Sequence, residues 1–116
     1  MPARAQRLPG RRHPRVPFAS DIAVQVPDWT ALQARGLDLS YGGMSLMLPQ
    51  PLSIGDRLLF GLRPSNGSPM QLEAVVRNVV RVAAGRFRVG LEWAGVVGDQ
   101  KHELRMFVDS VATAAA

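Results

Sequence analysis

The sequence predicts a mostly β fold, in which a small antiparallel barrel is closed by a helix near the C-terminus. Through most of the chain, apolar residues alternate with polar ones, which is typical of strands with one buried face. Turn signals that contain glycine or proline separate these segments at short intervals. Near the C-terminus the apolar spacing changes to that of an amphipathic helix. Five or six antiparallel strands followed by one helix favour a small barrel.

Five segments show the alternation, and each is expected to turn one apolar face toward the core. In chain order, these faces are Ile22, Val24 and Val26; Met44, Leu46 and Leu48; Leu58, Phe60 and Leu62; Leu72, Ala74, Val76, Val80 and Val82; and Phe87, Val89, Leu91 and Trp93. Asn78 interrupts the fourth face, so a β-bulge or a sharp bend is expected near it. Turns are expected at residues 63–69, which contain Asn-Gly between two prolines, and at residues 84–85.

The last segment carries one apolar stripe, formed by Leu104, Phe107, Val108 and Val111 at helical spacing. Asp99 is the expected N-cap of this helix, and the alanine-rich end at residues 114–116 is expected to fray. In a barrel of so few strands, side chains fill the interior. A ligand is therefore expected on the outer surface or at a rim.

The basic charge of the chain is concentrated at its N-terminus. Residues 1–15 contain five arginines and no acidic residue, which accounts for the whole formal net charge of +5 among 116 residues. The rest of the chain is balanced, so no broad positive face is expected on the body. A basic arm indicates an anionic partner: a nucleic acid, a membrane surface or a phosphorylated small molecule. We expect a flexible basic tail at residues 1–10 and one barrel domain at residues 11–113.

Composition and motifs exclude several classes of protein. The chain has no cysteine, which excludes a disulfide scaffold and thiolate metal sites. No apolar run approaches the roughly 20 residues of a membrane-spanning helix, so no membrane insertion is expected and a cytoplasmic location is predicted. His13 and His102 have no acidic residues at metal-ligand spacing, and no nucleophile-elbow or phosphate-loop motif occurs. The chain is therefore predicted to be a binding protein, not an enzyme, without a metal or cofactor.

Two short segments carry the candidate binding residues, and the first is RRHPR at residues 11–15. It places Arg11 and Arg15 four residues apart, just ahead of the first strand. Pro14 prevents a helix there, so an arm that curls around a ligand could bring the two guanidinium groups to it from different sides. A guanidinium group donates two hydrogen bonds to a phosphate, and it also reaches the O6 and N7 acceptors of guanine.

The second segment is DLSYGG at residues 38–43, between two expected strands. Asp38 offers carboxylate acceptors to the N–H edge of guanine, and the hydroxyl of Ser40 adds a short hydrogen bond. Gly43 lets the backbone approach closely or take a positive φ. Taken alone, this segment fits a Gly-Gly hairpin with an Asx-type turn better than a binding site. The presence of both segments in this order favours the binding site.

The two segments, followed by VGLEW at residues 89–93 and a closing helix, resemble the PilZ domain family. Members of this family are bacterial receptors for the second messenger cyclic di-GMP. The resemblance covers the chain from Arg11 to about Val111. It implies a six-stranded barrel with a C-terminal helix and an N-terminal arm that wraps the ligand.

The resemblance also implies a set of ligand contacts. Arg11 and Arg15 are expected to hold the phosphates and contact guanine. Asp38 and Ser40 are expected to read a guanine edge, and Gly43 is expected to keep the turn tight. Further candidate contacts are Arg7, Arg12 and Gly42.

The function that the resemblance implies is a cyclic di-GMP receptor or adaptor, which changes its arm and surface on binding and so regulates an unidentified effector protein. Two alternatives remain open. One is a ligand-independent interaction module of the same fold. The other is nucleic-acid binding through the arginine arm, which is less favoured because Trp29, Tyr41 and Trp93 are the only Trp or Tyr residues available for base stacking.

Overall fold

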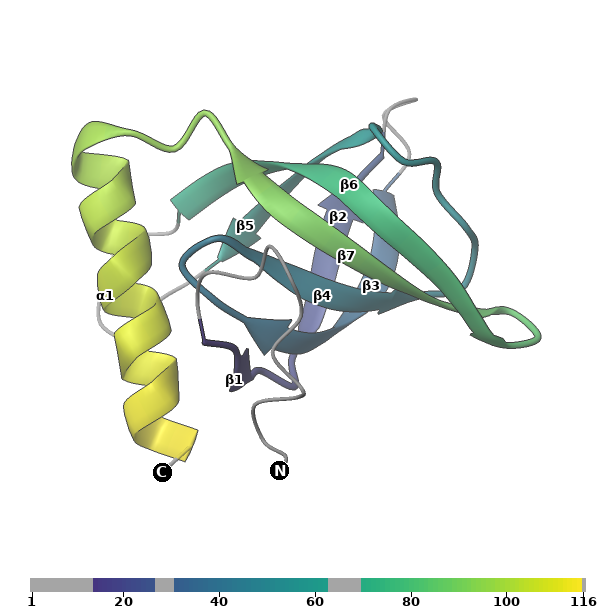
Figure 1. The fold of residues 1–116 in the computed structure, drawn as a ribbon, viewed down its shortest axis with the longest axis horizontal. Helices are drawn as coiled ribbons and strands as arrows, with labels where there is room; N and C mark the ends of the chain where they lie inside the picture. The colour runs from purple at the N-terminus through teal and green to yellow at the C-terminus, as the bar shows by residue number, and fades with distance from the viewer. Residues whose placement is uncertain (1–13, 27–30, 63–69, 116) are drawn as a thin grey trace, which may run out of the picture.

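The structure, a computed structural model, describes residues 14–26, 31–62 and 70–115. They form β1 (Val16–Pro17), β2 (Asp21–Gln25), β3 (Ala31–Leu39), β4 (Gly43–Leu48), β5 (Arg57–Leu62), β6 (Met70–Ala83), β7 (Arg86–Ala94) and α1 (Gly98–Ala115), as Figure 1 shows. The predicted tail at residues 1–10 and the predicted turn at residues 63–69 lie outside the described residues. The described part of the chain contains no helix with the length and apolar character needed to cross a bilayer.

Six strands form a closed antiparallel barrel, which confirms the predicted fold class. The strand order is β3-β2-β5-β6-β7-β4, and pairing of β4 with β3 closes the ring. The two-residue strand β1 pairs with the end of β3, where Val16 lies opposite Leu39 and Pro17 opposite Asp38. The segment just ahead of the barrel is thereby held against the barrel wall.

The core lies inside the barrel and continues beneath α1. The alternating residues of β2, β4, β5, β7 and the first half of β6 supply most of it, as the sequence predicts. Leu104, Phe107 and Val108 of the predicted helical stripe are buried in the same cluster. Figure 1 shows α1 standing across one end of the barrel, and there the ring of Phe107 meets that of Phe18 edge to face at 5.7 Å.

The helix itself is longer than its stripe. It begins at Gly98, so Asp99 lies in its first turn, and it continues to Ala115, into the segment where fraying is expected. An acidic side chain in the first turn interacts favourably with the helix dipole.

Strand β6 contains the irregularity that Asn78 predicts, because its register with β7 shifts between Val76 and Asn78. The expectation that Val80 and Val82 continue the core face is wrong, since these residues are 51% and 47% exposed. A bulge adds one residue to its strand, which reverses the side chains that face the core. Val79 packs against the core in their place.

The charges of the barrel are less evenly spread than the sequence suggests. Ion pairs between strands join Arg35 to Asp21, Arg57 to Glu73, and Arg77 to Glu92, in addition to the pair of Arg15 with Asp38. Among the described residues, Arg81, Arg86 and Arg88 near the β6–β7 turn make no ion pair. The balanced composition of the body therefore hides a local cluster of three arginines at this end of the molecule, although it forms no broad positive face.

Candidate functional site

The structure brings the two candidate segments together through an ion pair between Arg15 and Asp38. Nη1 of Arg15 donates to Oδ1 of Asp38 at 2.7 Å, and each side chain is only 21% exposed. The contact follows from the strand pairing: because β1 aligns Val16 with Leu39, Arg15 lies beside the chain as it leaves β3. The two residues are 23 positions apart in the sequence, so the barrel wall is what makes them neighbours.

Arg15 has hydrogen-bonding capacity that the described part of the chain does not use. Its Nε is buried and has no hydrogen-bond partner among the described residues. A buried N–H group without an acceptor costs about 1–3 kcal/mol. An anionic ligand that supplies the acceptor would recover this cost, and a guanidinium group donates through Nε and a terminal nitrogen together to a phosphate.

Ser40 shapes the turn that follows β3. Its Oγ accepts hydrogen bonds from the backbone N–H groups of Gly42 and Gly43, both at 3.2 Å, and it donates to the carbonyl oxygen of Gly43 at 3.3 Å. Ser40 is 3% exposed, and a hydroxyl has one donor and two acceptor positions. The hydroxyl is thus fully engaged within its own turn, and in this conformation its effect on a ligand comes through the position of its neighbours.

Gly43 is required by the close approach of two strands. A Cβ atom built at this position would lie 1.8 Å from the carbonyl oxygen of Leu91 on β7. Gly43 is not among the glycines with positive φ, so of the two roles predicted for it the structure supports close approach. No residue with a side chain fits there without displacing β7.

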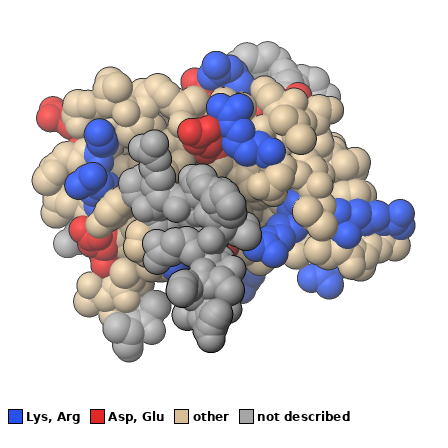
Figure 2. All heavy atoms as spheres, in the orientation of Figure 1, with Lys and Arg blue, Asp and Glu red and all other residues tan. Residues whose placement is uncertain are grey.

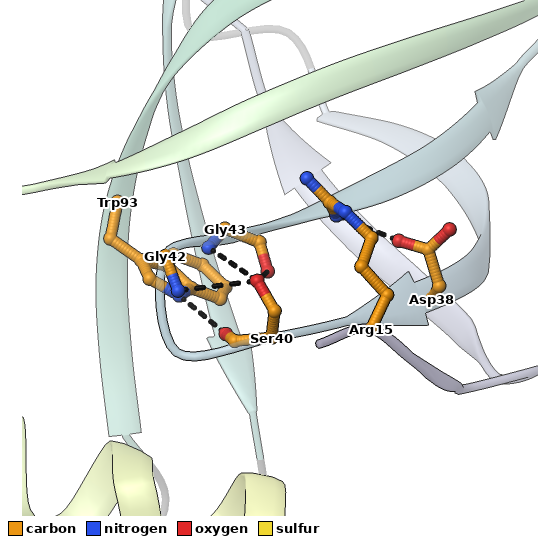
Figure 3. Close-up of polar contacts among 6 residues, drawn as sticks. All are labelled: Arg15, Asp38, Ser40, Gly42, Gly43 and Trp93. Carbon is orange, nitrogen blue, oxygen red and sulfur yellow. Dashed lines mark hydrogen bonds and ion pairs between the residues drawn. The ribbon is translucent and has the colours of Figure 1, made fainter. Parts of the chain in front are cut away.

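Trp93 fastens the same turn to β7 from the other side. Its indole Nε1 donates to the carbonyl oxygen of Ser40 at 3.1 Å, and its backbone N–H donates to the carbonyl oxygen of Gly42 at 3.0 Å. Its ring also packs against Phe60 in the core, with ring centroids 5.7 Å apart. Figure 3 shows the resulting arrangement, in which the hydrogen-bonded turn at residues 40–43 and the Arg15–Asp38 pair lie side by side.

The tip of the turn contacts α1 through Tyr41. The hydroxyl of Tyr41 donates to Oδ1 of Asp109, and the guanidinium group of Arg105 lies 4.9 Å from the centroid of the ring. The hydrogen bond to Asp109 is the largest cause of a raised pKa for Tyr41, because it favours the protonated hydroxyl. The turn is therefore linked to the helix as well as to the barrel.

A polar row extends from Asp38 across the outer face of the barrel. Cross-strand pairing aligns Asp38 with Ser45, Ser45 with Gly90, and Gly90 with Asn78. Directly paired residues point to the same face of a sheet. At Gly90 an added Cβ would lie 2.7 Å from the side-chain atoms of Asn78, so this amide covers the glycine. Sequence reasoning missed this row, for which the only signal is the polar interruption at Asn78.

Of the predicted contacts, the structure places Arg15, Asp38, Ser40, Gly42 and Gly43 around one turn at the barrel surface. The remaining predicted contacts lie outside the described residues: Arg7, Arg11 and Arg12.

A family model described as the PilZ domain matches residues 9–110. The chain belongs to the PilZ domain family. The matched range contains every residue of the turn and of the Arg15–Asp38 pair, and it includes Arg11. A comparison with curated proteins finds no significant match.

Several solved structures share the fold. The PilZ domain of YcgR from Escherichia coli, solved with c-di-GMP, is 19% identical, with a TM-score of 0.73 over 91% of this chain and 94% of that chain. The MrkH–c-di-GMP complex of K. pneumonia is 17% identical, with a TM-score of 0.71 over 92% of this chain and 55% of that chain. The Bacillus subtilis inhibitor of motility MotI is 20% identical, with a TM-score of 0.68 over 100% of this chain and 58% of that chain. This chain thus spans little more than half the length of the last two.

Proposed function

We propose that this PilZ domain is a receptor for cyclic di-GMP, and that ligand binding changes its N-terminal arm and surface so that it regulates a partner protein. Family membership supports a receptor role rather than a catalytic one. Among the similar structures, those of YcgR and MrkH contain c-di-GMP. A cytoplasmic location, predicted from the sequence, belongs to the same proposal.

The observation that carries the proposal is the half-buried pair of Arg15 and Asp38, with its unused Nε donor. Cyclic di-GMP presents phosphates and guanine edges, and these are the complementary partners of a guanidinium group and a carboxylate. In the proposed complex, Arg15 and Arg11 bind phosphate and guanine, and Asp38 accepts hydrogen bonds from the N–H edge of guanine. Ser40 and Gly43 hold the turn that positions Asp38, and Gly42, Arg7 and Arg12 are further candidate contacts.

We expect ligand binding to rearrange this pair. In the structure, Nη1 of Arg15 donates to one oxygen of Asp38. In the proposed complex, the phosphates draw Arg15 toward the ligand and free both carboxylate oxygens for guanine. Because Arg15 directly precedes β1, this movement is passed to the arm, which gives the proposed receptor a conformational output.

Calorimetric titration of the full chain with cyclic di-GMP and with cyclic di-AMP tests the proposal. We expect saturable binding that favours the guanine dinucleotide. A ligand with two phosphates should give a log–log salt slope no steeper than about −2, whereas a polyanion that engages all five arm arginines should approach roughly −3.5 to −4.5. Tighter binding of mixed-sequence DNA or RNA would replace this proposal with nucleic-acid binding.

Limited proteolysis separates the receptor from a ligand-independent interaction module. We expect cyclic di-GMP to slow tryptic cleavage after Arg7, Arg11, Arg12 and Arg15, because an arm held against the barrel no longer fits the protease cleft. Equal cleavage with and without the ligand would favour the interaction module.

A further inference from the structure

Strands β6 and β7 continue beyond their neighbours as a two-stranded ribbon, which Figure 1 shows projecting from the barrel. The pairing of β5 with β6 ends at Val75, and the last backbone bonds on that edge join Val76 to Gly55 and Asp56 at 2.8 and 2.9 Å. From there to Ala83, β6 pairs only with β7. One edge of β6 over residues 77–83, here called the free edge, therefore has no strand partner in the described part of the chain.

The free edge is open to solvent and apolar in part. Every residue over 77–83 except Val79 is exposed. The exposed residues include Val80, which the bulge near Asn78 turns away from the core, and Val82, which lies at a second register shift between Arg81 and Ala83. A strand edge with unpaired N–H and C=O groups and exposed β-branched side chains is a template for pairing with another chain.

The ribbon is also strongly basic. The sequence has no acidic residue between Glu73 and Glu92, and Glu92 is already bound to Arg77 at 2.6 Å. Arg81, Arg86 and Arg88 make no ion pair within the described residues. Figure 2 shows blue side chains without red neighbours at the end of the molecule where Figure 1 places the ribbon.

The charges of the ribbon determine which class of binding partner fits the free edge. A second copy of the chain would bring its own arginines against Arg81, and like charges on paired strands are destabilising. A nucleic acid would use the arginines and could use the unpaired N–H groups, but its phosphates, which only accept hydrogen bonds, would leave the edge carbonyls and the valines unused. An extended acidic peptide uses all three features.

We propose that the free edge of β6 binds an extended acidic segment of a partner protein as an additional β-strand. The segment places an apolar side chain beside Val80 on one face and an acidic side chain beside Arg81 on the other. At about 3.3 Å per residue, residues 77–83 offer an edge of roughly 20 Å, enough for about six residues of the partner. This rests on the proposed function only for the existence of a regulated partner, since strand addition does not require cyclic di-GMP.

Nuclear magnetic resonance of the full chain without cyclic di-GMP tests the proposal. The probe is a capped peptide of about seven alternating glutamate and valine residues, long enough to cover the edge. We expect chemical-shift changes and slower amide exchange within residues 77–83. Two control peptides, a lysine–valine peptide and a glutamate–valine peptide interrupted by proline, should each bind at least about tenfold more weakly. The first reverses the charge, and the second removes strand hydrogen bonds.

Two charge reversals form the matched pair of variants. Arg81→Glu should weaken the glutamate–valine peptide about fivefold or more, whereas Lys101→Glu, at an exposed site on α1, should stay within about twofold. Equal effects of the two variants, or peptide-induced changes outside the ribbon, would contradict strand addition. Strand addition would also be contradicted if a DNA duplex bound more tightly than the peptide and changed the chemical shifts of Arg86 and Arg88 without slowing amide exchange at the free edge.

The cyclic di-GMP affinity of Arg81→Glu is measured in the same series. We expect it to equal that of the parent chain, because Arg81 lies on the ribbon, away from the turn at residues 38–43. Failure of the strand-addition test and failure of the receptor proposal are thus told apart.

Discussion

The β3–β4 turn and the β6–β7 ribbon belong to the same barrel but are built in opposite ways. In the turn, the hydroxyl of Ser40 and the backbone groups of residues 40–43 are tied to one another and to Trp93. In the ribbon, one backbone edge and three arginines have no partner among the described residues. A rigid turn suits recognition of a small ligand, because little ordering entropy remains to be lost. An open edge suits a partner that brings its own strand.

The largest expected effect is that of a side chain at Gly43. Gly43→Ala should lower the free energy of unfolding by about 3 kcal/mol or more, because the added methyl group collides with the backbone of β7. Urea denaturation measures the change. Gly61→Ala is the matched control, since a Cβ there meets only an ordinary contact of 3.5 Å, and it should change stability by no more than about 1 kcal/mol. Equal losses in both variants would show that the turn is not specially constrained.

The second-largest expected effect is on the affinity for cyclic di-GMP. Arg15→Ala should weaken cyclic di-GMP binding by about 10-fold to 150-fold, since a charge-assisted hydrogen bond contributes about 1.5–3 kcal/mol. The melting temperature should barely move, because Arg15 lies outside the core. Arg57→Ala, which also removes one side of a strand-to-strand ion pair, should leave the affinity unchanged. Parent-like binding by Arg15→Ala would remove Arg15 from the proposed site.

Asp38 should control selectivity more than affinity. Asp38→Ala is expected to narrow the preference for guanine over adenine cyclic dinucleotides, because the lost carboxylate accepts from N–H groups that adenine does not offer at the same edge. The slope of log affinity against log salt concentration should stay close to that of the parent in Asp38→Ala. In Arg15→Ala the slope should become shallower by about 1. Calorimetry at several salt concentrations gives both quantities. Unchanged selectivity in Asp38→Ala would assign guanine recognition to other residues.

The smallest effect concerns the link between the turn and α1. Tyr41 is the only tyrosine in the chain, so the ultraviolet absorbance of tyrosinate reports its ionisation alone. The midpoint should lie above 10.0, because the hydrogen bond to Asp109 raises the pKa. Since the folded pKa is the higher one, the stability from this contact is present below the unfolded pKa and is lost as pH rises through the folded pKa. Asp109→Asn should return the midpoint toward 10.0.

The sequence predicted the parts of the fold that depend on regular alternation. It did not identify β3 by this pattern, because Ala34 and Gly36 occupy buried positions there and give little apolar signal. It predicted the bulge at Asn78 but continued the core face through it to Val80 and Val82. A bulge changes the register of every later residue, and one sequence does not show how many residues it adds.

The candidate site was predictable as a set of residues but not as a geometry. The order of the two motifs indicated that Arg15 and Asp38 act together, whereas their ion pair depends on the pairing of β1 with β3. The engagement of the Ser40 hydroxyl within its own turn required coordinates. The polar row through Ser45, Gly90 and Asn78 required the register of four strands, which is a long-range property of the barrel.

The indole of Trp93 gives the protein an optical reporter of its own. Its N–H is bound to the carbonyl oxygen of Ser40, so any displacement of the turn alters the polarity and hydrogen bonding around a fluorophore. The chain contains two tryptophans, and Trp29→Phe would leave Trp93 as the sole source of indole emission. Ligand entry at residues 38–43 could then be followed in real time, without a label, by the wavelength and intensity of that emission.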